Sequence, residues 1–146
     1  MNLFGILDIS GSALNAERQR AEVVTSNLAN AETTHTADGG PYKRQMVVFQ
    51  TTKPAASSFG RTFSGLREEP ARGVVVQNIV SDSTPSTKRY EPSHPDADAQ
   101  GFVSYPTINP IEEMAELMEA ARAYQMNVAA VQATKGMIAA SLDILR

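Results

Sequence analysis

Two heptad-spaced apolar stripes constrain this chain of 146 residues most strongly, one near each end and with every proline between them. A repeat that alternates steps of three and four residues predicts a helix that presents one seam to a partner helix. All eight prolines fall from Pro41 to Pro110, and proline interrupts helix interiors. We therefore expect a helix, a proline-containing middle and a second helix. The N-terminal stripe comprises Leu3, Leu7, Ser10, Leu14, Glu17, Ala21, Val24, Leu28 and Ala31, and the C-terminal stripe comprises Met114, Leu117, Ala121, Tyr124, Val128, Val131, Lys135, Ile138, Leu142 and Leu145.

Local signals place the expected elements along the chain. The first helix is expected to begin between Asp8 and Ser12, where three N-cap residues lie and two glycines weaken earlier turns, and to run to about Asn30. The second is expected from Pro110 to Leu145, with Asn109 as its N-cap and Glu112 as a capping-box partner. Strands are expected over 42–51, 74–80, 87–90 and 102–105, with a loop or long hairpin tip over 53–73.

These elements predict a mainly α fold with a β-rich middle. The long terminal helices are expected to form a coiled-coil-like pair, with a small domain of hairpins and extended segments between them. The expected organisation is an N-terminal axial helix over 1–34, a β-rich, proline-containing middle domain over 35–108 and a C-terminal axial helix over 109–146.

Composition argues against several function classes. The net charge is −3 and no basic patch is present, which argues against nucleic-acid binding. There is no cysteine, hence neither a disulfide framework nor a thiolate metal site. The N-terminal residues lack the basic and apolar regions of a cleaved signal peptide, and no stretch reaches the length that membrane insertion requires.

Only one cluster of side chains carries metal-ligand atoms, namely His94, Asp96 and Asp98. Their alternate spacing would place them on one face of an extended strand, but three ligands without a fourth make a thin metal site. The alternative is a proline-stiffened connector in which the aspartates form local turns, and we favour it. No signature of a nucleophile, a general acid–base pair or a phosphate loop is present, so we expect no enzyme activity, no cofactor, no metal and no small-molecule substrate.

Energetics indicate that the terminal helices need neighbours. Ordering a residue costs about 1–2 kcal/mol of backbone entropy, and fully burying an apolar side chain returns about 1.5–3 kcal/mol. A single partner helix covers only half of each stripe, so we expect helices that are marginal in an isolated chain and that are completed by assembly.

Three ordered blocks of residues resemble the bacterial flagellar axial proteins of rod and hook. The first block covers residues 14–34, including the run Ser26-Asn27-Leu28-Ala29-Asn30, and is similar to their N-terminal signature. The second, Tyr90-Glu91-Pro92-Ser93-His94-Pro95-Asp96-Ala97-Asp98 followed by Gly101-Phe102-Val103, resembles the segment peculiar to the C-type proximal rod family. The third, over 113–128, is similar to the C-terminal helix of the superfamily.

This resemblance implies a structural subunit of the proximal rod of the flagellar basal body, located in the periplasm and exported by the flagellar type III apparatus without a cleaved signal peptide. It implies terminal helices that self-assemble into a tube that transmits torque for motility, with other copies, other rod subunits and the export apparatus as partners. Together with the stripes it predicts an assembly interface of Leu7, Leu14, Ala21, Val24, Asn27, Leu28, Asn30, Leu117, Ala121, Arg122, Tyr124, Val128, Val131, Ile138 and Leu142.

Several alternatives stay open at this point. The chain could be a coiled-coil adaptor that is not exported, or a different axial subunit of the distal rod or hook junction. Asn27 and Asn30 could cap the first helix or make directional contacts between packed helices. Tyr124 lies on the stripe and is expected in a packed core, whereas Arg122 lies beside it and could pair with a neighbouring subunit or face solvent.

Overall fold

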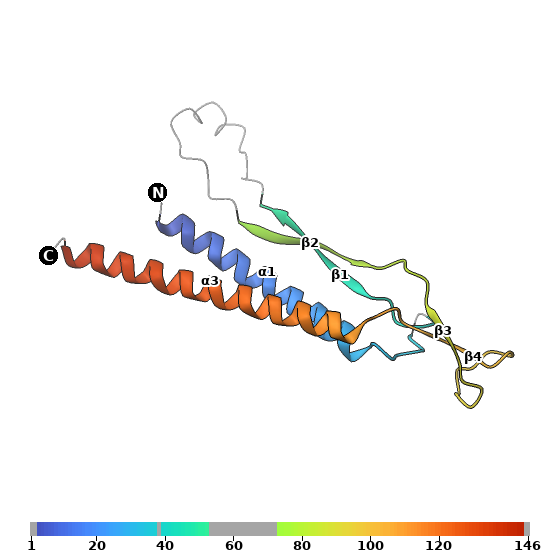
Figure 1. Ribbon diagram of the computed structural model, residues 1–146. Helices are drawn as coiled ribbons and strands as arrows, with labels where there is room; N and C mark the ends of the chain where they lie inside the picture. The colour runs from blue at the N-terminus through green and yellow to red at the C-terminus, as the bar shows by residue number, and fades with distance from the viewer. Residues whose placement is uncertain (1–2, 38, 53–72, 145–146) are drawn as a thin grey trace, which may run out of the picture.

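A computed structural model describes residues 3–37, 39–52 and 73–144. Two long helices, α1 (Leu3–Ala29) and α3 (Pro110–Ile144), flank four strands, β1 (Gln45–Thr51), β2 (Val74–Ser81), β3 (Thr87–Tyr90) and β4 (Phe102–Tyr105). Figure 1 shows α1 and α3 running antiparallel side by side, with α3 extending past the N-terminal end of α1. The structure confirms the expected mainly α fold with a β-containing middle.

Helix α1 begins at Leu3, so the predicted start between Asp8 and Ser12 is wrong. The glycines weaken helix propensity, but propensity is overridden when a face of the helix is packed. Leu3, Leu7 and Ser10 are all half-buried or buried in the first two turns, and no heavy atom lies within 4 Å of a Cβ added at Gly11. The helix ends at Ala29, one residue before the predicted end, where Asn30 N–H donates to the Ser26 carbonyl at 3.1 Å.

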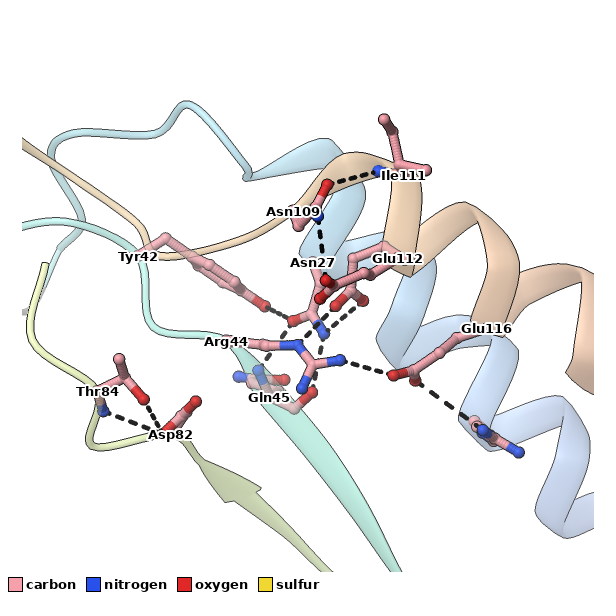
Figure 2. A network of polar contacts seen from close by, with 12 residues as sticks. Asn27, Tyr42, Arg44, Gln45, Asp82, Thr84, Asn109, Ile111, Glu112 and Glu116 are labelled. Atoms are coloured by element: carbon pink, nitrogen blue, oxygen red, sulfur yellow. Dashed lines mark hydrogen bonds and ion pairs between the residues drawn. The ribbon is translucent and has the colours of Figure 1, made fainter. Parts of the chain in front are cut away.

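Strands β1 and β2 pair antiparallel from Gln45↔Ser81 to Thr51↔Val74. The register shifts between Val48 and Phe49 because Gln77 of β2 is inserted as a bulge. The first strand is shorter than the predicted span 42–51, since Tyr42 and Arg44 turn their side chains toward the helices (Figure 2). Apart from Gly73, the predicted loop over 53–73 lies outside the described residues.

Strands β3 and β4 form a second antiparallel pair, from Thr87↔Tyr105 to Tyr90↔Phe102, with the bounds that the sequence predicts. The rings of Tyr90 and Phe102 meet edge to face with centroids 5.4 Å apart. Gly101 has φ +83°, and a Cβ there would come within 2.9 Å of the Tyr90 ring, so this turn requires glycine.

The N-terminus of α3 is capped as predicted, with one difference in detail. Asn109 Oδ1 accepts from the Ile111 N–H at 3.1 Å, and Glu112 Oε1 accepts from the Asn109 side-chain amide at 3.1 Å rather than from its backbone (Figure 2). The helix continues for 35 residues, about 50 Å at 1.5 Å per residue. Of the helices in the described part of the chain, none is long and apolar enough to cross a membrane.

Helix α1 occupies the centre of the molecule. It packs against α3 on one side and against β1 and β2 on the other (Figure 1). The buried apolar side chains are correspondingly concentrated on this helix, where Ala16, Val23 and Val24 are 7 % exposed or less. Among the described helices and strands, α3 contacts α1, and the side of α3 that faces away from α1 has no other helix or strand against it.

Candidate assembly interface

The face of α3 that meets α1 is displaced from the apolar stripe. Its most shielded positions recur every seven residues, one residue before one row of the stripe. These positions carry small or polar side chains rather than large apolar ones. Three of them are buried and Asn127 is half-buried: Glu113, Ala120, Asn127 and Thr134.

The predicted interface residues of α3 divide into two groups as a result. The half-buried ones are Leu117, Val128, Val131 and Ile138, and the exposed ones are Ala121, Arg122, Tyr124 and Leu142. Tyr124 is 41 % exposed within this chain, so the prediction that it packs in a core is wrong for the single chain. Leu142 is 61 % exposed. A single chain therefore leaves part of this stripe open to solvent, with exposed members in both of its heptad rows.

The predicted interface residues of α1 are shielded within the chain itself. Val24 and Asn27 are buried, and the remaining ones are half-buried: Leu7, Leu14, Ala21, Leu28 and Asn30. The difference from α3 arises because α1 has two partners in the chain, the helix α3 and the hairpin β1–β2.

Asn27 joins three elements at one end of the helix pair (Figure 2). Its amide nitrogen donates to the Gln45 carbonyl at 2.8 Å and to Glu113 Oε2 at 3.1 Å. Its amide oxygen accepts from the Gln45 N–H at 2.9 Å and from the Tyr42 hydroxyl at 3.2 Å. The side chain is fully buried and its hydrogen-bonding groups are used, so Asn27 fixes the start of β1 against both helices.

Asn30 acts locally instead. Its amide nitrogen donates to the Ser26 carbonyl at 2.9 Å, and its amide oxygen accepts from the Thr33 hydroxyl at 3.1 Å. The two asparagines of the N-terminal block thus have different roles, one in contacts between elements and one in ending the helix.

Arg44 forms the charged part of the same junction. Its Nε donates to Glu113 Oε1 at 2.6 Å and its Nη2 to Glu116 Oε1 at 2.7 Å. Glu113 is 1 % exposed, so its charge depends on Arg44 and Asn27 for compensation. The hydrogen bond to Glu113 is the largest contribution that raises the pKa of Arg44, and burial of the guanidinium opposes it.

A second arginine continues this charged row along the helix pair. Arg20 of α1 lies 3.5 Å from Glu119 and 4.0 Å from Glu116 of α3, and also 4.0 Å from Glu17. Acidic side chains from the first turns of α3 are therefore matched by arginines from α1 and from the residue before β1. This pairing sets the register and the antiparallel direction of the two helices.

Asp82, beyond the end of β2, completes the junction next to Arg44. Its N–H donates to the Arg44 carbonyl at 2.7 Å, and its carboxylate accepts from the hydroxyl and the N–H of Thr84 (Figure 2). The hydrogen bond from the Thr84 hydroxyl is the main cause that lowers the pKa of Asp82.

The other end of the hairpin is attached to α1 through Ser12. The Ser12 hydroxyl accepts from the Val74 N–H at 3.0 Å and donates to the Ile9 carbonyl at 2.7 Å. A Cβ placed on Gly73 would lie 2.4 Å from this hydroxyl, so the close approach requires glycine. The hairpin is consequently held along α1 at two points, near Asn27 and near Ser12.

The residues considered for metal binding organise a turn instead. Asp98 accepts from the N–H groups of Gln100 and Phe102, both at 2.9 Å. The Thr34 hydroxyl donates to Asp96 at 2.6 Å, and His94 Nδ1 accepts from the Asp96 N–H at 3.1 Å. The hydrogen bond from the Phe102 N–H is the main cause that lowers the pKa of Asp98. These contacts match the local-turn interpretation of the aspartates.

Sequence reasoning missed the residues that complete the junction. Tyr42 lies in the strand predicted over 42–51, and no local pattern singles out Arg44 or Glu113. These two residues lie 69 positions apart, so no local pattern joins them. The available signal is weak: a glutamate one residue before Met114, the first residue of the α3 stripe.

Two family models match this chain. The model for the flagella basal body rod protein matches residues 7–34, and the model for the C-terminal part of the flagellar basal body rod FlgEFG proteins matches residues 99–144. The matched segments contain most of α1 and all of α3, including Asn27 and Glu113.

Curated relatives match over nearly the whole chain. The flagellar basal-body rod protein FlgC of Bacillus subtilis strain 168 is 38 % identical over 148 residues, covering 99 % of both chains. FlgC of Borreliella burgdorferi is 34 % identical, covering 100 % of this chain and 99 % of its own. FlgC of Escherichia coli O157:H7 is 38 % identical, covering 99 % and 98 %. This chain belongs to the FlgC family of flagellar basal-body rod proteins.

Proposed function

We propose that this rod protein is a structural subunit of the proximal rod, and that its terminal helices pack with those of neighbouring subunits into a tubular shaft that transmits torque. Its role is mechanical rather than catalytic. The interface is the predicted set of stripe residues, with the exposed α3 members Ala121, Arg122, Tyr124 and Leu142 in contact with other subunits. The α1 members act mainly by holding the helix pair together.

The observation that carries this proposal is the exposed part of the apolar stripe of α3. Tyr124 and Leu142 are 41 % and 61 % exposed, although they lie in a heptad pattern that runs the length of the helix. Exposed apolar surface of this extent typically marks a protein–protein interface. Heterologous contacts between identical chains generate helical tubes when the rotation does not close.

The exposed methionines of α3 support neighbours of more than one kind. Met114, Met118, Met126 and Met137 are each 48 % exposed or more. Methionine adapts its shape to different partners. A rod that joins several related proteins requires such adaptability, which agrees with other copies and other rod subunits as partners.

Membership of the family, rather than any contact within this chain, supports the proposed export route and location. We propose that the chain passes through the flagellar export apparatus without a cleaved signal and reaches the periplasmic part of the basal body. Deletion of the export apparatus should retain the chain inside the cell, as detected by immunoblotting of cell fractions.

The test of the interface places a charge on two exposed residues of the α3 stripe. Tyr124→Asp and Leu142→Asp should leave the isolated chain folded, because both positions face solvent within one chain. They should abolish rod assembly, since each would bury an unpaired carboxylate between subunits. The measurement is the presence of the rod in basal bodies isolated from a complemented deletion strain, together with motility in soft agar.

Tyr124→Phe and Leu142→Met are the matched controls, because each keeps an apolar side chain of similar size at the same position. Both should assemble. Normal motility of the Tyr124→Asp and Leu142→Asp variants, or equal loss in the conservative variants, would contradict the assignment of these exposed stripe residues as the interface.

A further inference from the structure

The hairpin β1–β2 has two outer edges, and its hydrogen bonds reveal which residues form them. Asp82 N–H donates to the Arg44 carbonyl at 2.7 Å, and Thr52 N–H donates to the Gly73 carbonyl at 2.9 Å. Backbone groups alternate between the two sides of a strand. Val47, Phe49 and Thr51 of β1, and Val76, Ile79 and Ser81 of β2, therefore direct their N–H and C=O groups away from the partner strand.

Helix α1 occupies only one end of each edge. Asn27 uses the outward N–H and C=O of Gln45, at the start of β1. Ser12 uses the outward N–H of Val74, at the start of β2. The free stretch of β1 thus runs over 47–51 and that of β2 over 76–81. The sheet has two strands among the described residues, and no other strand of that part of the chain covers either stretch.

The amino acids of these strands do nothing to block pairing. Neither strand contains a charged residue or a proline, whereas the neighbouring strand β3 carries Lys88 and Arg89. Natural proteins protect exposed edges with charges, prolines or short strands, and a long uncharged edge pairs with another chain. The N–H of Ile79 lies on this edge and donates to the side chain of the adjacent Asn78 at 2.9 Å. No strand of the described residues uses it.

The outward face of the same hairpin is apolar. Met46 is paired with Val80, and Val48 and Val75 lie on the same side of the sheet. These four side chains are 40–45 % exposed. On the opposite face Val47, Val74 and Val76 are half-buried, while Ile79 and Phe49 are 46 % and 37 % exposed. A chain that pairs with this edge would also cover part of this apolar face.

We propose that β2 of one copy pairs antiparallel with β1 of the next copy, so that the hairpins of adjacent subunits form one continuous sheet around the helices. The occupant is a second copy of this chain, because each hairpin offers one free β1 edge and one free β2 edge that suit each other. The inference rests on the proposed rod assembly and adds a second contact to the one made by the helices.

The geometry of this pairing suits a tube in which all subunits point the same way. β1 and β2 run in opposite directions, so β2 next to β1 of the following copy is antiparallel without inverting either subunit. Two uncharged strands also place no like charges opposite each other. The free stretch of β1 extends toward the Thr51–Val74 end of the hairpin, and that of β2 extends toward the Gln45–Ser81 end. Pairing the two stretches in full therefore staggers consecutive copies along the strands, which produces a helical rather than a flat arrangement.

Cysteine cross-linking in assembled rods tests this contact, since the natural chain contains no cysteine. Pairing of Ile79 with Phe49 of the next copy places Val80 beside Val48 of that copy, as a pair without mutual hydrogen bonds. Such pairs have Cα atoms about 4.5 Å apart, within the range of a disulfide. A register shifted by two residues places Val80 beside Gln50 instead. Within one hairpin, Val80 pairs with Met46, so neither pair can close inside a single copy without distortion.

The variants are Val48→Cys/Val80→Cys and Gln50→Cys/Val80→Cys, with each single substitution as its control. After oxidation of isolated basal bodies, one of the double variants should give a non-reducing gel ladder at multiples of 15.7 kDa that reducing agent removes. Mass spectrometry should find only this chain in the ladder. The single variants should stay monomeric, because each supplies a cysteine to only one edge.

Three results would overturn the pairing. The first is absence of the ladder from both double variants in basal bodies that contain them. The second is a dimer formed by Val80→Cys alone, which would mean symmetric β2–β2 contacts. The third is a ladder that contains a different protein. Motility and recovery of the chain in basal bodies are measured in parallel, so failure of the rod assignment itself would be seen separately as absence of the unsubstituted chain from the rod.

Discussion

Helices α1 and α3 carry apolar stripes of the same spacing but use them differently. Every α1 stripe residue that the structure describes is at least half-buried, because α3 and the hairpin cover the helix from two sides. The α3 stripe meets α1 only along one border. The buried positions of α3 lie one residue before stripe positions and carry Glu113, Ala120 and Thr134. A heptad pattern therefore identifies a surface for packing without identifying the partner, which for α1 is the same chain and for the exposed part of α3, as we propose, is another one.

The difference also separates two kinds of specificity. Direction and register within the chain are set by the polar junction of Asn27, Arg44 and Glu113, where hydrogen bonds and charges must be matched. The exposed part of the α3 stripe and the methionines beside it offer adaptable apolar side chains that need few matched hydrogen bonds or charges. A subunit that meets several neighbours benefits from a fixed internal geometry and a tolerant outer surface.

The largest expected difference between the two helices concerns a buried charge. Val24→Asp in α1 should lower the free energy of unfolding by about 4 kcal/mol or more, because Val24 is 3 % exposed and the new carboxylate would be buried. Leu142→Asp in α3 should change it by less than about 0.5 kcal/mol. Urea unfolding of the full chain, followed by circular dichroism, measures both. Similar losses in the two variants would mean that the stripes are equally buried in the free chain.

Removal of Arg44 tests the junction. Arg44→Ala should cost about 3–5 kcal/mol, because it leaves the buried Glu113 carboxylate without its cation. Arg18→Ala is the matched control, because both side chains of the Arg18–Glu22 ion pair, 3.3 Å apart, are exposed to solvent. This pair should contribute less than about 0.5 kcal/mol to the free energy of unfolding. Equal, small effects from both arginines would show that the junction is not what holds the hairpin and helices together.

Sequence predicted the parts of this fold that depend on neighbouring residues. The cap at Asn109 and the bounds of β3 and β4 follow from local spacing. The start of α1 could not be predicted in this way, because tertiary packing compensates for its glycines. The junction could not be predicted either, since Arg44 and Glu113 meet only after the chain has folded. For α3, the pattern identified the apolar stripe but not that the positions facing α1 lie one residue before it.

Two glycines offer a smaller test of the same contrast. Gly73→Ala should cost about 1–3 kcal/mol, because the added Cβ would meet the Ser12 hydroxyl of α1 at 2.4 Å. Gly136→Ala in α3 should instead stabilise the chain by about 0.5–1 kcal/mol, as nothing lies within 4 Å of the added atom and alanine favours helices. Thermal unfolding distinguishes the signs.

Combining Gly73→Ala with Ser12→Ala provides the internal check. Each substitution alone disturbs the contact between β2 and α1, since Ser12 also accepts from the Val74 N–H. The double variant should therefore lose less than the sum of the two single losses. Strict additivity would show that the hairpin does not rest on α1 at this point.

The smallest expected effect lies in the turn between β3 and β4, which extends the comparison to a part of the chain that is stabilised locally. The Phe102 N–H holds the pKa of Asp98 below its usual range. A carboxylate with a lowered pKa in the folded state contributes stability above its unfolded pKa, and this contribution is lost as pH falls through the folded pKa. Asp98→Asn keeps an acceptor oxygen but removes the charge, so the variant should be slightly less stable than the natural chain at neutral pH. The difference should vanish as pH is lowered below the folded pKa, when Asp98 is itself neutral. Unfolding curves across this pH range measure it, and a difference that grows on acidification would reverse the assigned sign and with it the role of Asp98 in ordering the turn.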